Sequence, residues 1–402
     1  MNPIAIYSFT SPLHQAEAVD AVASEFLNSL KVDYDFRGDD FTHYGDHMLD
    51  LIFIRTGGTE GIFRQMLPIL LEKSSKPFYL LTSGKSNSLA ASMEILSYIQ
   101  KNQLQGEIIH GSAEYIRQRV LSLSKTMAAK KQLNECRIGV IGKPSDWLIA
   151  SDVDAGIVKQ KMGVTLVNIP MTELLEAINQ THGGGTVEKK NHTPLIDAAL
   201  PGAYRIYDAL KAIIGRYHLN GLTLRCFDLL NTVHNTGCLA LAKLNAEGIV
   251  AGCEGDIPTA ITMMLALATV GETGFQANPS QINVETCEVL FAHCTIPFNM
   301  VERYEYDTHF ESGIGVGIRG FVKEGPVTII KVSGDGSRHF IAEGQLLQCQ
   351  SNPDLCRTQL LIKLDDKSAA AYFLTQPIGN HHVILRGRHQ TEFQQLMSTF
   401  SR

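Results

Sequence analysis

The sequence predicts an α/β protein with two doubly wound (Rossmann-like) parallel-sheet domains followed by a β-rich C-terminal domain. Short apolar runs alternate with helical patterns in the first third of the chain, and this alternation starts again near residue 137. From about residue 274, period-two runs and tight turns replace it. A chain of 402 residues also exceeds one usual hydrophobic core. We therefore expect domains at residues 1–133, 134–272 and 273–402.

The first predicted domain alternates strands with helices. Strands are expected at 4–9, 51–55, 78–82 and 107–110, and helices at 16–30, 61–71 and 88–101. This alternation is typical of a parallel sheet that is covered by helices on both faces. A polar helix at 125–133 is a plausible bridge to the next domain.

The second predicted domain repeats the pattern. Its expected strands are 137–142, 164–169, 222–226 and 249–253, and its later helices are 237–246 and 258–269. The last two strands and the helix between them form a βαβ unit, which is right-handed almost always.

The third predicted domain is antiparallel. Strands are expected at 289–293, 327–332, 339–342 and 359–364, with a glycine-containing hairpin turn at 333–337 and a closing helix at 390–400.

Composition excludes several classes of protein. The formal net charge is −6 and no basic run stands out, so nucleic acid is not an expected partner. No apolar run reaches the roughly 20 residues that span a bilayer, and the N-terminus lacks a signal-peptide pattern. The eight cysteines include no Cys-x-x-Cys pair and are expected as free thiols. We expect a cytoplasmic protein without membrane partners.

Three segments far apart in the chain carry side chains that can bind one divalent metal. They hold Glu254, His293 and the pair His381-His382. Carboxylate oxygen with imidazole nitrogen suits a hard or borderline ion such as Mn²⁺. Because adjacent residues of a strand point to opposite faces, only one histidine of the pair faces a given site. The other is left for a second-sphere or substrate contact.

The settings of these residues differ in what they indicate. Glu254 follows a buried strand, at the carboxyl edge where ligand sites form in open α/β sheets. Asp256 precedes Pro258 and Thr259, so it is expected to cap the following helix. Trp147, the single tryptophan, is either a stacking wall for a sugar or a core anchor. His309 stands in a polar, glycine-rich turn and is a possible ligand-facing residue.

Three motifs together resemble the L-fucose isomerase/L-arabinose isomerase superfamily. They are Gly252-Cys253-Glu254-Gly255-Asp256, Phe291-Ala292-His293 and Gly379-Asn380-His381-His382, and the resemblance covers about residues 222–400. It implies that Glu254 is the acid/base group and a metal ligand. It also implies that His293 and His382 are ligands, with Mn²⁺ the most plausible ion, and that His381 and His309 orient substrate hydroxyls.

The activity that the resemblance implies is aldose–ketose isomerisation of a free sugar, such as L-fucose or L-arabinose, through an enediol. It further implies a homo-oligomer, a hexamer or trimer, with shared active sites. We add Trp147 and Asn278 as substrate-binding candidates.

One departure from the family pattern opens an alternative. The superfamily has a second acidic ligand where this chain has Ala277. Asn278 can ligate through oxygen but cannot accept a proton as a carboxylate does. Either Glu285 or Glu288 supplies the acid, or the chemistry differs. The alternative function is a sugar-binding or regulatory relative that has lost turnover.

Overall fold

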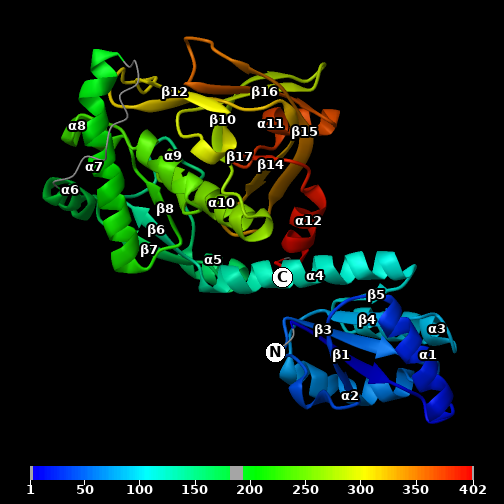
Figure 1. Cartoon of the computed structure of the whole chain (residues 1–402). Helices are drawn as coiled ribbons and strands as arrows, with labels where there is room; N and C mark the ends of the chain where they lie inside the picture. Colours follow the sequence, from blue (N-terminus) through cyan, green and yellow to red (C-terminus); the bar gives the residue numbers. More distant parts are fainter. Residues whose placement is uncertain (1–2, 182–192, 401–402) are drawn as a thin grey trace. The chain divides into compact units, whose positions relative to one another are not determined.

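The computed structural model describes residues 3–181 and 193–400 (Figure 1). The chain forms two compact units, Met1–Ala128 and Ala129–Arg402. The regions expected as central and C-terminal domains both belong to the second unit.

The first unit contains a five-stranded parallel sheet in the order β2-β1-β3-β4-β5. Its elements are β1 (Ile4–Phe9), α1 (Ala16–Ser29), β2 (Asp35–Gly38), the 3₁₀ helix η1 (Phe41–His43), β3 (Leu49–Ile54), α2 (Glu60–Lys73), β4 (Phe78–Thr82), α3 (Ser88–Lys101), β5 (Gly106–Ile109) and α4 (Ala113–Glu135), whose last residues belong to the second unit. One core joins the sheet to α1 and α4, and another joins it to α2 and α3. The predicted doubly wound arrangement is confirmed.

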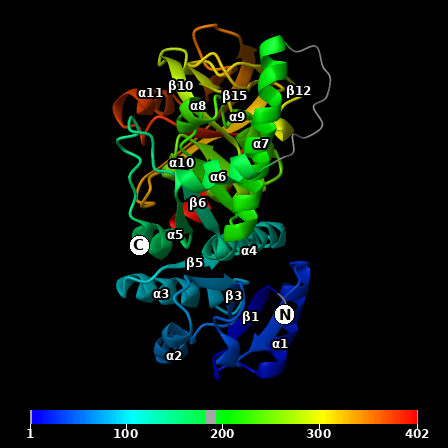
Figure 2. The ribbon, with the colours of Figure 1, turned by 90° about the vertical axis from the view of Figure 1, so that its left-hand side faces the viewer.

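The second unit opens with a four-stranded parallel sheet in the order β7-β6-β8-β9. Its elements are β6 (Arg137–Ile141), α5 (Ala155–Met162), β7 (Thr165–Ile169), α6 (Met171–Gln180), α7 (Pro194–Tyr217), β8 (Gly221–Leu224), α8 (Asp228–Thr232), α9 (Cys238–Ala246), β9 (Val250–Cys253) and α10 (Ile257–Val270). Helices α6, α7 and α9 pack on one face of the sheet (Figure 2).

Helix α10 lies between this sheet and the β-rich part of the same unit. Residues Ile257–Ala266 are all buried, so the helix is apolar on every side, as expected of a fully enclosed helix. Its side chains share a core with Ile138 of β6 and with Val332 and Val383 of the β-rich part. Because α10 packs against both parts, the turn that precedes it lies beside the β-rich part.

The β-rich part is a closed barrel with the strand order β10-β11-β16-β15-β14-β17, together with the two-stranded ribbon β12-β13. Its elements are β10 (Phe275–Asn283), β11 (Glu288–His293), the 3₁₀ helix η2 (Phe298–Met300), β12 (Arg303–Asp307), β13 (Gly317–Phe321), β14 (Gly325–Val332), β15 (His339–Gln350), β16 (Thr358–Leu364), α11 (Lys367–Thr375), β17 (His382–Arg386) and α12 (Gln390–Ser398). The paired barrel strands are antiparallel, as predicted.

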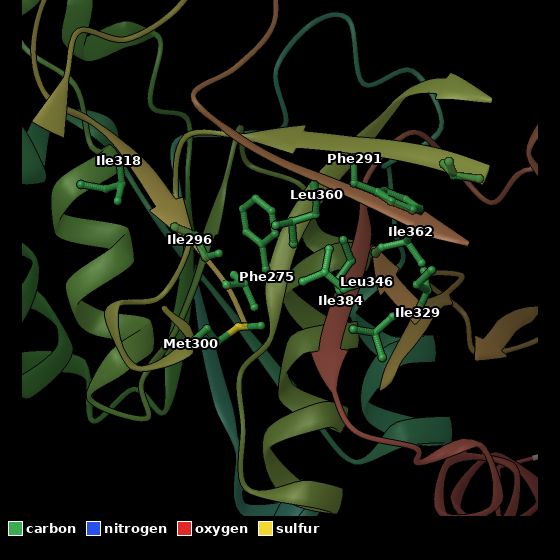
Figure 3. Packing of buried hydrophobic residues seen from close by; sticks show 14 of the residues in the cluster. Phe275, Phe291, Ile296, Met300, Ile318, Ile329, Leu346, Leu360, Ile362 and Ile384 are labelled. Carbon is green, nitrogen blue, oxygen red and sulfur yellow. The ribbon is translucent and has the colours of Figure 1, made fainter. Parts of the chain in front are cut away.

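Alternate residues of the barrel strands fill its core. Phe275, Phe291, Ile329, Leu360 and Ile384 pack there against one another (Figure 3). The predicted β-rich region is therefore confirmed as a barrel. The eight cysteines are free thiols, as expected.

Candidate metal centre

The turn between β9 and α10 holds Glu254 in an unusual backbone conformation. Glu254 has φ +62° and Gly255 has φ +71°, both in the left-handed region. A Cβ at Gly255 would lie 2.4 Å from the carbonyl oxygen of Lys143, so only glycine fits. The Glu254 carbonyl accepts a hydrogen bond from the backbone N–H of Ser145 at 2.9 Å. A non-glycine residue held in this region often marks a functional position.

Glu254 meets two histidines from the barrel. One possible ligand atom from each of Glu254, His293 and His381 lies within 4.8 Å of the others, and all three residues are buried. Glu254 Oε1 is 3.3 Å from His381 Nε2 and 3.7 Å from His293 Nε2. Thus the sheet supplies the carboxylate and two barrel segments supply the imidazoles.

His381 Nε2 is the atom that most directly indicates a ligand-binding site. It is buried and has no well-aligned hydrogen-bond partner in the part of the chain that the structure describes. Buried polar atoms are rarely left in this state without an ion or water to satisfy them. One carboxylate oxygen and two imidazole nitrogens also form a donor set suited to a divalent transition ion. The residues present therefore fit a metal.

Asp256 fixes the orientation of His381. His381 Nδ1–H donates to Asp256 Oδ2 at 2.8 Å, which turns Nε2 towards Glu254, where loss of its proton would give a lone pair for a metal. The same aspartate caps α10, because Oδ1 accepts from the backbone N–H of Thr259 at 2.9 Å. The predicted cap is confirmed, and the structure adds a second contact that sequence reasoning missed.

The remaining ligand candidates also have supporting contacts. His293 Nδ1 lies 3.0 Å from Thr295 Oγ1, so donation from Nδ1–H leaves Nε2 unprotonated. Trp147 Nε1–H donates to Glu254 Oε2 at 2.7 Å. The second carboxylate oxygen is thereby held while Oε1 faces the histidines.

Electrostatics keep the carboxylates ionised. Burial disfavours the charged form of Glu254, but the charge of His381 and the nearby His293 ring hold its pKa below the usual range. Burial likewise disfavours an imidazolium at His381, yet Glu254 and Asp256 raise its pKa to about 9. Burial lowers the pKa of His293. Without a metal, a proton on His381 therefore balances the nearby carboxylates.

His382 does not face this cluster, which corrects the predicted ligand set. Tyr372 O–H donates to His382 Nε2 at 3.0 Å, and His382 Nδ1–H donates to the carbonyl of Asn380 at 3.1 Å. Both ring nitrogens are thus occupied. The ring lies against Phe340 and Phe373, and burial lowers its pKa to about 3. Of the pair, His381 takes the position expected for His382.

Ala277 packs among apolar side chains of the barrel core. It pairs with His382 across β10 and β17, and it is fully buried in the barrel core. The next residue towards the N-terminus, Gln276, reaches the site instead. Its Oε1 accepts from the backbone N–H of Cys253 at 2.8 Å, which braces the residue before Glu254. Ala277 is therefore not a vacant ligand position.

The other acidic and amide candidates are not in the cluster. Neither Glu285 nor Glu288 belongs to the group of possible ligands found among the described residues. Asn278 accepts a hydrogen bond through Oδ1 from Asn380 Nδ2 at 3.0 Å. Its predicted contact with a substrate stays a prediction.

Aromatic side chains extend from Glu254 to His309. The Trp147 and Phe227 rings are 4.7 Å apart, and the Phe227 and His309 rings are 5.4 Å apart. Trp147 is 52% exposed, so part of its ring is accessible and it is not a core anchor. Burial, with the charge of His293, lowers the pKa of His309 to about 4, which keeps this ring neutral near pH 7.

Lys331 of β14 is a further buried group that sequence reasoning missed. It is 1% exposed, and its Nζ lies 2.5 Å from Thr259 Oγ1 and 3.5 Å from Asp256 Oδ2. Burial lowers its pKa and Asp256 opposes that shift. The available signal was a lysine inside the apolar run Ile329-Ile330-Lys331-Val332.

Comparison with known proteins identifies distant sugar isomerases. A sulfoquinovose isomerase of Alkalicoccus urumqiensis is 20% identical over 332 residues, which cover 78% of this chain and 75% of the relative. Sulfoquinovose isomerases of Priestia aryabhattai and Priestia megaterium are each 24% identical over 281 residues, which cover 66% of this chain and 63% of each relative. No family model matches the chain. None of the helices in residues 3–181 and 193–400 could cross a membrane.

Proposed function

We propose that this protein is a metal-dependent aldose–ketose isomerase of a free monosaccharide. The observation that carries the proposal is the buried group of Glu254, His293 and His381, in which His381 Nε2 faces Glu254 Oε1 at 3.3 Å without a well-aligned hydrogen bond among the described residues. The distant relatives support the same class, since their names describe isomerisation of a sugar. Mn²⁺ is our proposed ion, and sulfoquinovose joins L-fucose and L-arabinose as a candidate substrate.

The chain supplies ligands and a proton acceptor for this reaction. A divalent ion bound here would polarise adjacent sugar oxygens and stabilise the negative charge of an enediolate. Glu254, His293 and His381 would hold it. Glu254 stays ionised, so its carboxylate can accept the proton from C2 of the aldose and return one to C1. The C2–H bond breaks and a C1–H bond forms through the enediol, while the proton of the C2 hydroxyl moves to the C1 oxygen, so no external oxidant or reductant is needed.

Residues near Glu254 would bind and orient the sugar. Trp147 is our candidate for stacking on an apolar face of the ring, because its own face is partly open. His309 is neutral and can donate to or accept from a hydroxyl. We further propose that the protein is a homo-oligomer, a hexamer or trimer, which light scattering on the eluting species would test.

The direct test is sugar conversion by metal-stripped protein that is reloaded with Mn²⁺. The substrates are sulfoquinovose, L-fucose and L-arabinose, and ketose formation is measured in D₂O. A proton route predicts solvent deuterium at C1 of the ketose. Glu254→Gln keeps the side-chain shape and removes the base, so it should be folded and inactive. Absence of ketose from every sugar, with Mn²⁺ bound, would contradict the proposal.

One observation keeps a second candidate, a sugar-binding protein without turnover. The cluster found in the described residues contains a single carboxylate, Glu254. Such a protein would be stabilised against heat by one of these sugars and give no ketose. The conversion assay and a thermal-shift assay with the same sugars separate the two candidates.

A further inference from the structure

Lys331 stands out because burying a lysine is costly. Removing an ammonium group from water carries a penalty of several kcal/mol that ion pairing often only offsets. Replacing a buried ion pair with apolar side chains is often neutral or stabilising. The fold alone therefore gives no strong reason to place a buried ammonium on β14, where the flanking residues Ile330 and Val332 belong to an apolar core.

The contacts of Lys331 point towards the metal centre. Its Nζ lies 3.5 Å from Asp256 Oδ2, the same oxygen that accepts from His381 Nδ1–H at 2.8 Å. Thr259 Oγ1 lies 2.5 Å from Nζ and also donates to Asp256 Oδ2 at 2.7 Å. Lys331, Asp256 and His381 thus form one continuous buried series that ends at His381 Nε2, which faces Glu254 Oε1 at 3.3 Å.

We propose that Lys331 is a positioning residue for the metal centre and acts through Asp256. This inference rests on the metal site of the proposed function. The ammonium is a buried counter-charge beside Asp256 Oδ2 and, with Thr259, holds this carboxylate in place. Asp256 accepts from Nδ1–H of His381, and this contact directs Nε2 towards Glu254 and His293.

The direction in which Lys331→Met changes the affinity for Mn²⁺ separates this role from simple charge repulsion. If Lys331 acted only through space, its positive charge would repel a divalent cation, and Lys331→Met would bind Mn²⁺ more tightly. If Lys331 holds Asp256, the same substitution loosens His381 and weakens binding. Loss of a second-sphere partner typically lowers metal affinity 10–100-fold. We expect Lys331→Met to weaken Mn²⁺ binding by about 10-fold or more.

A double-mutant cycle tests whether the effect passes through Asp256. Asp256→Asn keeps a good helix cap but removes the charge, and its amide N–H₂ competes for the position facing His381. Asp256→Asn alone should weaken Mn²⁺ binding by about 10–100-fold. Adding Lys331→Met to it should change the affinity by less than about twofold, because the acceptor is already lost.

The readouts are Mn²⁺ affinity, measured by calorimetry and by electron paramagnetic resonance of the free ion, and melting temperature in chelator. Thr328→Val is the matched control. Thr328 is a fully buried residue of the same strand, with hydrogen bonds to Gly387 and His389 and, among the described residues, none to Asp256. It should lower the melting temperature and leave Mn²⁺ affinity unchanged.

Several outcomes would overturn the inference. One is that Lys331→Met binds Mn²⁺ as tightly as the unmodified protein, or more tightly. Another is that Thr328→Val loses as much Mn²⁺ affinity as Lys331→Met. A third is that the affinity losses of Lys331→Met and Asp256→Asn add fully in the double mutant. If the unmodified protein bound no divalent ion, the proposed function itself would fail. If it bound Mn²⁺ and made ketose while Lys331→Met bound normally, only the role of Lys331 would be wrong.

Discussion

Binding of Mn²⁺ is expected to quench the tryptophan fluorescence of this protein. Trp147 is the only tryptophan, so all tryptophan emission comes from one ring. Its Nε1 lies 2.7 Å from Glu254 Oε2. A ligand oxygen is roughly 2.0–2.6 Å from a bound divalent ion, which places the ion within about 5–7 Å of the indole nitrogen. A paramagnetic ion at that distance should suppress most of the emission.

The assay is a Mn²⁺ titration of metal-stripped protein with selective excitation of tryptophan. The quenching curve should give the same dissociation constant as calorimetry. Diamagnetic Mg²⁺ serves as the control for a conformational effect, and Glu254→Gln should lose the quenching because the ligand charge is gone. Calorimetric binding of one Mn²⁺ per chain with unchanged emission would refute the reasoning, since the ion would then lie elsewhere.

Trp147→Phe extends the same experiment. A hydrogen bond to a charged group contributes about 1.5–3 kcal/mol, and we discount this to about 1 kcal/mol because the indole is half exposed. Mn²⁺ affinity should therefore fall about fivefold. Unchanged affinity would show that the indole does not help to position Glu254.

Three further outcomes are expected. His381→Ala should abolish Mn²⁺ binding measured by calorimetry, whereas His382→Ala should retain it. Because His382 is a buried, hydrogen-bonded core residue, His382→Ala should instead lose about 1–3 kcal/mol of unfolding free energy in urea. The reverse pattern would restore the sequence-based ligand set. Ala277→Glu should not restore or improve activity but should destabilise the protein by about 3–5 kcal/mol, since it places a carboxylate in the barrel core; a stable, more active variant would contradict this. Mn²⁺ at 100 times its dissociation constant should stabilise the metal-stripped protein by about 2.7 kcal/mol in the same urea assay, and an unchanged transition would argue against a site in the folded state.

The sequence predicted the fold where local patterns were strong. Apolar runs such as β3 and β4 are buried along their whole length and were found at nearly their observed bounds. β2 was missed because Asp35-Phe36-Arg37-Gly38 is short and polar, as edge strands often are. α11 was missed because its nine residues lie between barrel strands, where the surrounding pattern indicated β structure.

The site was predicted in part, and its errors have one physical origin. Glu254 follows β9 and His293 ends β11, and these two residues lie together in the group of possible ligands. The choice between His381 and His382, and between Ala277 and Gln276, depends on which face of a strand points into the barrel. A shift of one residue moves each side chain to the other face of the strand, and only the register between β10 and β17 decides which side chains face the barrel interior. That register is tertiary information.

Helix α10 has a consequence for attempts to divide this protein. Its buried faces are covered by the parallel sheet and by the barrel together, so neither part encloses the helix alone. A fragment that ends at residue 272 would expose the side of α10 that packs against Val332 and Val383. Such an exposed apolar surface promotes aggregation. The sheet and the barrel should therefore be expressed, exchanged between homologues and redesigned as a single piece.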